Sequence, residues 1–200
     1  MPTPEPHLAL LTPADDGLVH EAGLVLADAF DPGENHLQRA LFAGVELDAV
    51  REATRLQMLQ IVYRGVRDKE VWVASAASAA SGGERSPIGA VMIVSPPASK
   101  DARDTRPATP YDAALDAVTP PETAAAFAQL NEQSWAKQAA AYDPPKEEGY
   151  HVSMLGTAAE YYARLGFSLL DRNTFDVRGV PVTFWIMAKS AEPEAAAAGA

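Results

Sequence analysis

The sequence of 200 residues contains no cysteine. This absence excludes a disulfide scaffold, a thiolate zinc site and a cysteine nucleophile. Basic residues are also scarce, since 16 Lys and Arg stand against 27 Asp and Glu and give a net charge of −11. Because phosphate groups would repel such a chain, we expect neither a nucleic acid nor an anionic membrane as its partner.

The chain also lacks a long hydrophobic run. Its longest uncharged apolar stretch, Val180 to Ala188, is far shorter than the roughly 20 residues of a membrane-spanning helix. The first residues, MPTPEPHLALL, have no basic segment ahead of an apolar one, so no signal peptide is predicted and we expect a cytoplasmic or nuclear protein. The four histidines lack the spacing of metal ligands, and no metal site is predicted.

A chain of this length is typical of one domain with flexible ends. We predict a flexible N-terminus over residues 1–6, a single domain over 7–189 and a disordered alanine-rich tail over 190–200. Within the domain, the segments near 76–87 and 96–112 are rich in small, polar or proline residues. These two segments are predicted to be mobile loops.

Apolar residues at helical spacing predict several helices. One ends at Asp31-Pro32-Gly33, and residues 12–16 before it carry hydroxyl and carboxylate groups suited to capping it. A second helical pattern runs over 37–67 with a break near Gly44. Further helices are predicted over residues 123–142 and 158–165, the last ending at Gly166.

Runs rich in β-branched residues predict the strands. In 150–156, alternation assigns His151, Ser153 and Leu155 to one face and the residues between them to the other. The fold class that follows is α+β, with a mixed, mostly antiparallel sheet flanked by helices. The predicted strands are residues 7–11, 70–74, 88–94, 150–156, 168–177 and 182–188, with a tight turn over 178–181.

Several segments, taken in order, resemble the GCN5-related N-acetyltransferase superfamily. Ala159 to Phe167, AEYYARLGF, is similar to the family's "A..LY.RLGF" segment, and a terminal hairpin of the right length follows it. Residues 27–32 resemble the turn between the family's first two helices, and residues 149–156 resemble its fourth strand. The predicted helix over 123–142, which opens with PPETAAAFAQLNE, is similar to an insertion of a fungal branch of the family. The resemblance covers most of residues 7–189 and implies acetyl-CoA as co-substrate.

One part of the family's pattern is missing. The family's fourth strand runs into a loop of the form Gln/Arg-x-x-Gly-x-Gly/Ala, whose N–H groups hold the diphosphate of acetyl-CoA. Here Gly156-Thr157 leads directly to the 158–165 helix, so this loop, the usual third helix and the fifth strand are absent. Strand 150–156 thereby loses a ladder partner, and we predict that a strand of the C-terminal hairpin takes the vacant place.

The resemblance assigns a catalytic role to Tyr162, which matches the family's tyrosine and would protonate the departing thiolate. The alternative is that Tyr162 packs against the core. For its neighbour Tyr161 we expect packing.

The other candidate residues belong to the predicted strand or to the first helix end. The backbone of Met154, Leu155 and Gly156 corresponds to the family's cofactor-binding strand and would hold the reacting carbonyl. His151 is the one histidine of that strand and a candidate for the amine's proton, although a structural role explains it as well. Phe30 and Asp31 would line the acceptor site by analogy, and a plain helix end explains them equally.

Three hypotheses follow. The first is transfer of an acetyl group from acetyl-CoA to a primary amine of a small molecule or protein. The second is a non-catalytic relative, or a shortened gene product, that acts as a binding or dimerising module, which would make the chain a possible homodimer. The third is an unrelated α+β protein.

Overall fold

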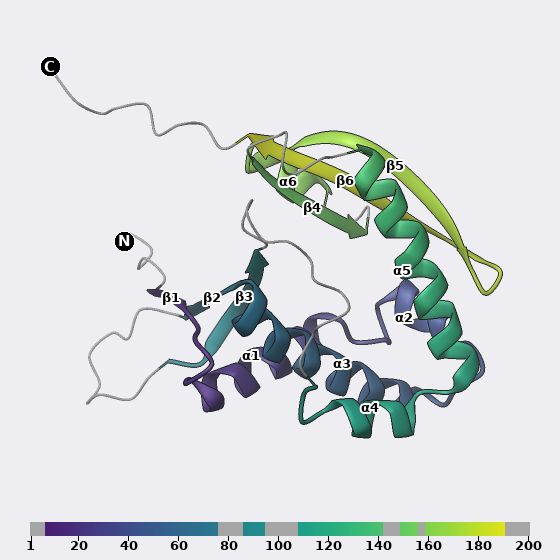
Figure 1. Ribbon diagram of the computed structural model, residues 1–200, viewed down its shortest axis with the longest axis horizontal. Helices are drawn as coiled ribbons and strands as arrows, with labels where there is room; N and C mark the ends of the chain where they lie inside the picture. The colour runs from purple at the N-terminus through teal and green to yellow at the C-terminus, as the bar shows by residue number, and fades with distance from the viewer. Residues whose placement is uncertain (1–6, 76–85, 95–107, 142–148, 156–158, 191–200) are drawn as a thin grey trace, which may run out of the picture. The chain divides into compact units, whose positions relative to one another are not determined.

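The computed structural model describes residues 7–75, 86–94, 108–141, 149–155 and 159–190 (Figure 1). The N-terminus, the tail from residue 191 and most of both predicted mobile loops lie outside these ranges. The chain divides into two compact units, Met1–Thr123 and Ala124–Ala200. The single domain over 7–189 therefore stays a prediction.

The first unit follows the predicted order of one strand, helices and two further strands. Antiparallel strands form one sheet in the order β1-β2-β3. The break expected near Gly44 is confirmed, since this residue has φ +86° and separates two helices. The elements are β1 His7–Leu10, α1 Asp16–Ala29, α2 His36–Leu41, α3 Leu47–Asp68, β2 Glu70–Ser75, β3 Ile88–Val94 and α4 Asp112–Val118, with α5 Pro121–Ala141 beginning at its end.

The core of this unit lies between the sheet and helices α1 and α3. Val71 and Val73 of β2 point to this side, as strand alternation requires, and are buried with Val62 and Val66 of α3. Gly89 is an extra residue in the β2–β3 ladder, because Ala90 pairs with Ala74 whereas Ile88 pairs with Ser75. This bulge allows Ile88 to return to the buried side of the sheet.

Helices α1 and α3 approach each other closely at Gly23. A Cβ atom at this position would lie 2.6 Å from Cδ2 of Leu59 and 2.9 Å from its Cα. The second distance matters more, because the Cα belongs to the α3 backbone and cannot rotate away. The sequence therefore needs glycine here for packing.

The predicted cap of α1 is only partly correct. The Asp15 carboxylate makes no hydrogen bond to the first turn of α1. Instead, one oxygen accepts hydrogen bonds from the backbone N–H and the hydroxyl of Thr12, each at 2.8 Å. The carboxylate therefore fixes the turn that leads into the helix.

Helix α4 was missed, because no element was predicted between the mobile loop near 96–112 and the helix over 123–142. The signal lies in Thr109-Pro110-Tyr111-Asp112, where a hydroxyl residue precedes an acid by three positions and proline follows it. Asp112 accepts a hydrogen bond from the Thr109 N–H at 2.7 Å and from the Thr109 hydroxyl at 2.6 Å. It also accepts from Gln60 Nε2 at 2.7 Å and from Arg64 Nη2 at 3.1 Å, which ties α4 to α3.

The second unit confirms the predicted pairing of strand 150–156. It contains residues 124–141 of α5, together with β4 Gly149–Leu155, α6 Ala159–Arg164, β5 Ser168–Val177 and β6 Val180–Ser190. Its antiparallel sheet has the order β4-β6-β5. The final strand β6 thus pairs with every residue of β4, from Gly149 opposite Ser190 to Leu155 opposite Phe184.

The turn of the C-terminal hairpin is shorter than predicted. It consists of Arg178 and Gly179, with φ values of 53° and 83°, while Val180 and Pro181 belong to β6. Two consecutive positive φ values are typical of the two-residue turn that matches the twist of a hairpin. Pro181 lies beyond the part of β6 that pairs with β4, so its missing N–H breaks no bond of that ladder.

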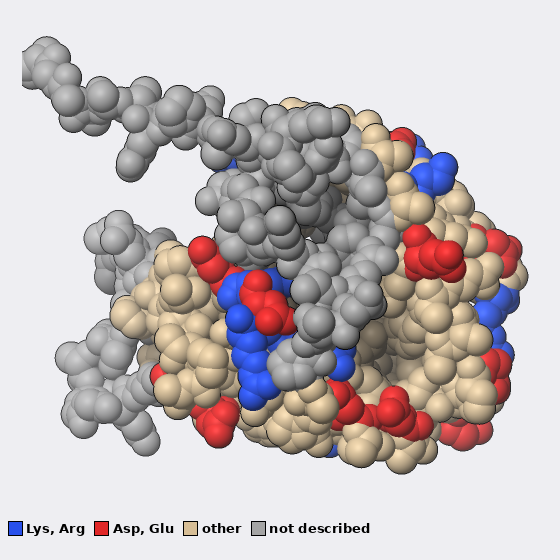
Figure 2. Space-filling model, viewed as in Figure 1, with Lys and Arg blue, Asp and Glu red and all other residues tan. Residues whose placement is uncertain are grey.

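The α+β class with antiparallel strands flanked by helices is confirmed, with the strands arranged in two three-stranded sheets. Lys and Arg side chains gather over the C-terminal part of α3 on the face shown in Figure 2, with acidic side chains beside them. This segment carries Arg64, Arg67, Asp68, Lys69 and Glu70. Among the described helices, none is long and apolar enough to cross a bilayer.

Replacing Gly23 with alanine should destabilise the first unit by about 1–3 kcal/mol, because the added methyl group overlaps the α3 backbone. Gly17 of the same helix is a matched control, since nothing lies within 4 Å of a Cβ placed there. Gly17→Ala should raise the stability by roughly 0.5–1 kcal/mol through helix propensity. Urea unfolding of both variants measures the difference, and equal effects would contradict the close approach.

Asp112→Asn should lower stability at neutral pH by roughly 1–2 kcal/mol. Burial opposes ionisation of Asp112, but hydrogen bonds from Thr109 and Gln60 and the charge of Arg64 outweigh it and lower its pKa from 3.8 to about 2. Because the pKa is lowered on folding, the stabilisation is complete above pH 3.8 and is lost as the pH falls through about 2.

The difference in unfolding free energy between the wild type and Asp112→Asn should therefore shrink as the pH is lowered through this window. Asp116→Asn, on an exposed position of the same helix, is the control and should show little difference. A difference between wild type and Asp112→Asn that does not change between pH 5 and pH 2.5 would refute the role of the carboxylate.

Candidate functional site

Tyr162 lies on α6, and the end of this helix explains the LGF segment in physical terms. The Phe167 N–H donates to the Tyr162 carbonyl at 3.1 Å, and the Gly166 N–H donates to the Ala163 carbonyl at 3.0 Å. Gly166 has φ +85°. This pair of bonds around a left-handed glycine is the Schellman motif, which satisfies carbonyls at a helix end.

The same motif brings the Tyr162 and Phe167 rings together. Their centroids are 5.5 Å apart and their planes meet at 83°, a favourable edge-to-face arrangement. Both rings and Trp185 pack against Met187 of β6, which is 3 % exposed. Tyr162 is therefore half-buried and held by packing, which supports the packing role and also fixes the residue in place for a chemical one.

A lysine reinforces this helix end. Lys189 Nζ donates to the Leu165 carbonyl at 2.9 Å. A cation at this position satisfies a helix carbonyl and opposes the negative end of the helix dipole. Since Trp185, Met187 and Lys189 alternate along β6, they share one face of the sheet, which we call the α6 face.

The predicted cofactor strand is β4, whose backbone pairs with β6. Met154 pairs with Trp185, and Leu155 pairs with Phe184. Gly156 lies outside the described residues. The β4 edge that pairs with β6 is occupied over the whole strand, so its N–H groups on that side are already bonded.

The strand register separates His151 from Tyr162. His151 pairs with Ala188, and Ala188 alternates along β6 with Met187, against which Tyr162 packs. The position of His151 therefore belongs to the face opposite the α6 face. The register does not bring the two predicted catalytic residues together.

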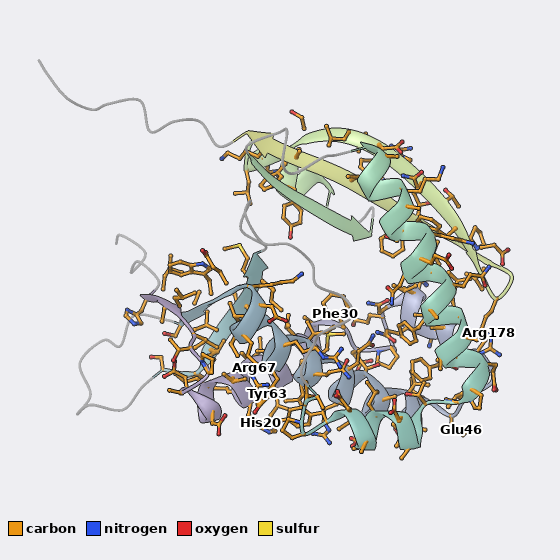
Figure 3. All side chains as sticks on the ribbon, viewed as in Figure 1. His20, Phe30, Glu46, Tyr63, Arg67 and Arg178 are labelled. Atoms are coloured by element: carbon orange, nitrogen blue, oxygen red, sulfur yellow. The ribbon has the colours of Figure 1, made fainter. Side chains whose placement is uncertain are left out.

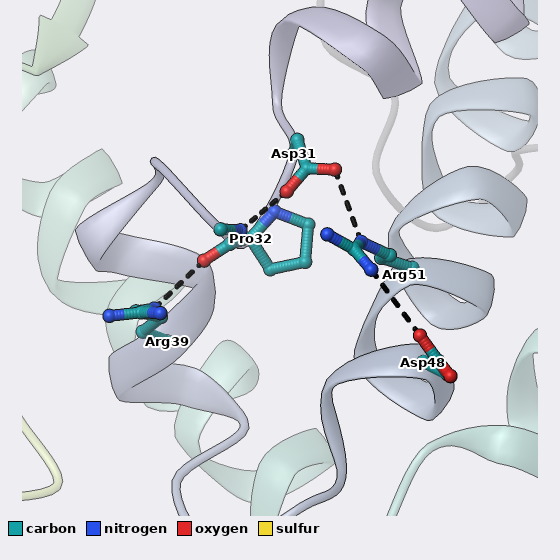
Figure 4. Close-up of polar contacts among 6 residues, drawn as sticks. Asp31, Pro32, Arg39, Asp48 and Arg51 are labelled. Atoms are coloured by element: carbon teal, nitrogen blue, oxygen red, sulfur yellow. Dashed lines mark hydrogen bonds and ion pairs between the residues drawn. The ribbon is translucent and has the colours of Figure 1, made fainter.

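Phe30 and Asp31 belong to the first unit, at the end of α1. Phe30 is the C-cap residue that follows α1 (Figure 3), and it is 37 % exposed. Asp31 is engaged on both oxygens, accepting from the Gly33 N–H and from Arg51 Nε at 3.2 Å (Figure 4). Arg51 also pairs with Asp48 at 3.3 Å. These contacts make Asp31 an anchor of the turn, while its predicted place at an acceptor site stays a prediction.

A second polar cluster, unexpected from the sequence, joins α1, α3 and the start of α4. His20 Nδ1 lies 3.2 Å from the Tyr111 hydroxyl, and the rings of Tyr111 and Tyr63 meet at 82°. Arg67 lies over the Tyr63 ring at 4.6 Å and donates to its hydroxyl at 3.2 Å (Figure 3). The cluster joins residues up to 91 positions apart, so no local pattern could reveal it. Its contacts hold the start of α4 against α1 and α3.

No group of three or more potential ligands that could hold a metal ion occurs among the residues described. The chain matches no protein-family model. It also matches no curated protein.

Among solved structures, the chain is similar to a protein from Rhodopseudomonas palustris described as a GCN5-related N-acetyltransferase and as a class-II aminotransferase. The sequence identity is 14 %, the TM-score is 0.42, and the match covers 95 % of this chain and 98 % of the other. A likeness of this size carries no argument about activity. It does not support the fungal branch.

Gly166→Ala should destabilise the α6 end by about 1 kcal/mol or more, because alanine is strained at φ +85°. Gly166→Asn is the matched comparison, since asparagine tolerates this conformation better. Hydrogen exchange at the Phe167 amide, which donates to Tyr162, measures the loss. Equal protection in the alanine, asparagine and wild-type proteins would contradict the Schellman cap.

Proposed function

We propose that the chain is an N-acetyltransferase of the GCN5-related type, which transfers an acetyl group from acetyl-CoA to a primary amine. The observation that carries this proposal is the fixed position of Tyr162. The residue that matches the family's tyrosine is held by a helix cap and by the Phe167 ring on the α6 face. A neutral phenol so placed is suited to act as a general acid.

In the proposed reaction, the amine nitrogen attacks the thioester carbonyl carbon and the carbon–sulfur bond breaks. The departing thiolate takes the phenolic proton of Tyr162, and the amine gives up its proton to water. Water is assigned this role because the position of His151 belongs to the opposite face of the sheet. The phenolate then recovers a proton from solvent, so the enzyme is unchanged.

A specific observation favours the second candidate, a non-catalytic binding or dimerising module. The family holds its acyl donor between its fourth and fifth strands, and β6 here occupies the edge of β4 along seven paired residues. The diphosphate loop is also missing from the sequence. Both features weaken acetyl-CoA binding relative to a complete member of the family.

Calorimetric titration of the full chain with acetyl-CoA separates the two candidates. Binding near micromolar or tighter supports the acetyltransferase, and no binding at millimolar acetyl-CoA supports the module. Release of free CoA on mixing with primary amines can be followed with a thiol reagent, because the protein has no cysteine to react.

Tyr162→Phe should lower turnover about 100-fold while acetyl-CoA affinity changes little, since phenylalanine keeps the ring contact and loses only the proton. Tyr161→Phe is the control and should retain turnover. Unchanged turnover in Tyr162→Phe would show that Tyr162 is not the acid.

A further inference from the structure

The α6 face carries positive charge in a chain whose net charge is −11. Arg172 of β5 pairs with Trp185 and therefore lies on this face, as Lys189 does. Asp176 of β5 pairs with Pro181 and is therefore an acidic residue on the same face. Its Oδ1 accepts from the Gly179 N–H at 2.9 Å, so it is held at the turn, away from the Tyr162 end of the strand.

Arg172 is stacked on an aromatic ring, with its Cζ 4.0 Å from the centroid of Trp185. A guanidinium that stacks in this way keeps the N–H groups in its plane available for other partners. The Arg172 side chain is exposed, and its guanidinium makes no ion pair or hydrogen bond with the side chains of the described residues. It is thus a cation whose orientation is fixed before any ligand arrives.

Tyr162 and Arg172 contact neighbouring positions of the same strand. Tyr162 packs against Met187, and Arg172 stacks on Trp185, two residues and about 7 Å further along β6. A molecule whose reacting end lies at Tyr162 and which follows β6 in this direction would reach the Arg172 guanidinium. A planar guanidinium matches a phosphate oxyanion, which it can bind through two parallel hydrogen bonds.

We infer that Arg172, stacked on Trp185, binds a phosphate group of acetyl-CoA on the α6 face. This inference rests on the proposed function, because it assumes that the acyl group reacts at Tyr162. Arg172 of β5, held by Trp185 of β6, would thus supply a phosphate contact in a chain that lacks the diphosphate loop. Lys189 is left out of the contact because its ammonium group already binds the Leu165 carbonyl.

Arg172→Gln tests the inference by calorimetric titration of the full chain. The Kd for acetyl-CoA should rise about tenfold or more, as expected for a lost charged hydrogen bond. The Kd for S-acetylpantetheine, which has the thioester but no phosphate, should not change. Arg172→Lys should lie between wild type and Arg172→Gln, because lysine keeps the charge but not the paired donors.

Arg55→Gln is the matched control, because it removes one exposed arginine charge from α3 in the first unit. It should leave both Kd values unchanged. Circular dichroism melting of each variant checks that Arg172→Gln still folds. If Arg172→Gln and Arg55→Gln bind acetyl-CoA equally well, the inference is wrong. It is also wrong if Arg172→Gln alters only the KM for amines that carry a carboxylate, since the guanidinium would then bind the acceptor.

Titration with inorganic pyrophosphate separates this inference from the proposed function. Pyrophosphate binding that weakens in Arg172→Gln supports the phosphate site even where acetyl transfer is not detected, and in that case the proposed function fails alone. Acetyl transfer with no effect of Arg172→Gln on either ligand overturns this inference alone. If neither pyrophosphate nor acetyl-CoA binds the wild type, both fail.

Discussion

The hydrogen-bonded ladders of β6 organise the second unit. This strand pairs with β4 on one side and with β5 on the other, so both neighbours depend on its register. It also supplies three side chains of the α6 face. Arg172 stacks on Trp185, the Tyr162 ring packs against Met187, and Lys189 binds a carbonyl at the end of α6. A strand that made only one of these ladders would leave either β4 or the hairpin without its main-chain partner.

This arrangement has a consequence for chemistry. Because β6 satisfies one edge of β4 completely, that edge offers no free N–H group to a bound thioester. Any donor on β4 must lie on its other edge or beyond Leu155. The same ladder fixes which residues share a face of the sheet. Tyr162 packs on the face that carries Met187, and the position of His151 belongs to the opposite face. The proposed chemistry therefore belongs to the α6 face, where Tyr162 is held.

Much of the fold could be predicted from local patterns. The strands over 70–74 and 88–94, the break at Gly44 and the helix end at Gly166 each depend on a few neighbouring residues, and each is confirmed. The pairing of β4 could also be predicted, because a strand with unsatisfied backbone groups needs a partner. Helix α4 was missed although Thr109 to Asp112 carries a capping signal, since a short helix with no buried residue leaves no apolar period to find.

The face on which Arg172 lies depends on a single extra residue. Leu169 pairs with Met187 and Asp171 pairs with Ile186, so Leu170 has no partner in the ladder. In a regular strand, residues 169 and 172 would lie on opposite faces, because side chains alternate. The bulge at Leu170 reverses the alternation and brings Arg172 onto the same face as Leu169 and Trp185. No local feature of the sequence SLLDRNTF marks Leu170 as the extra residue, which only the pairing with β6 identifies. The position of the guanidinium is thus a property of two strands together, and for this reason it was not among the residues predicted from the sequence.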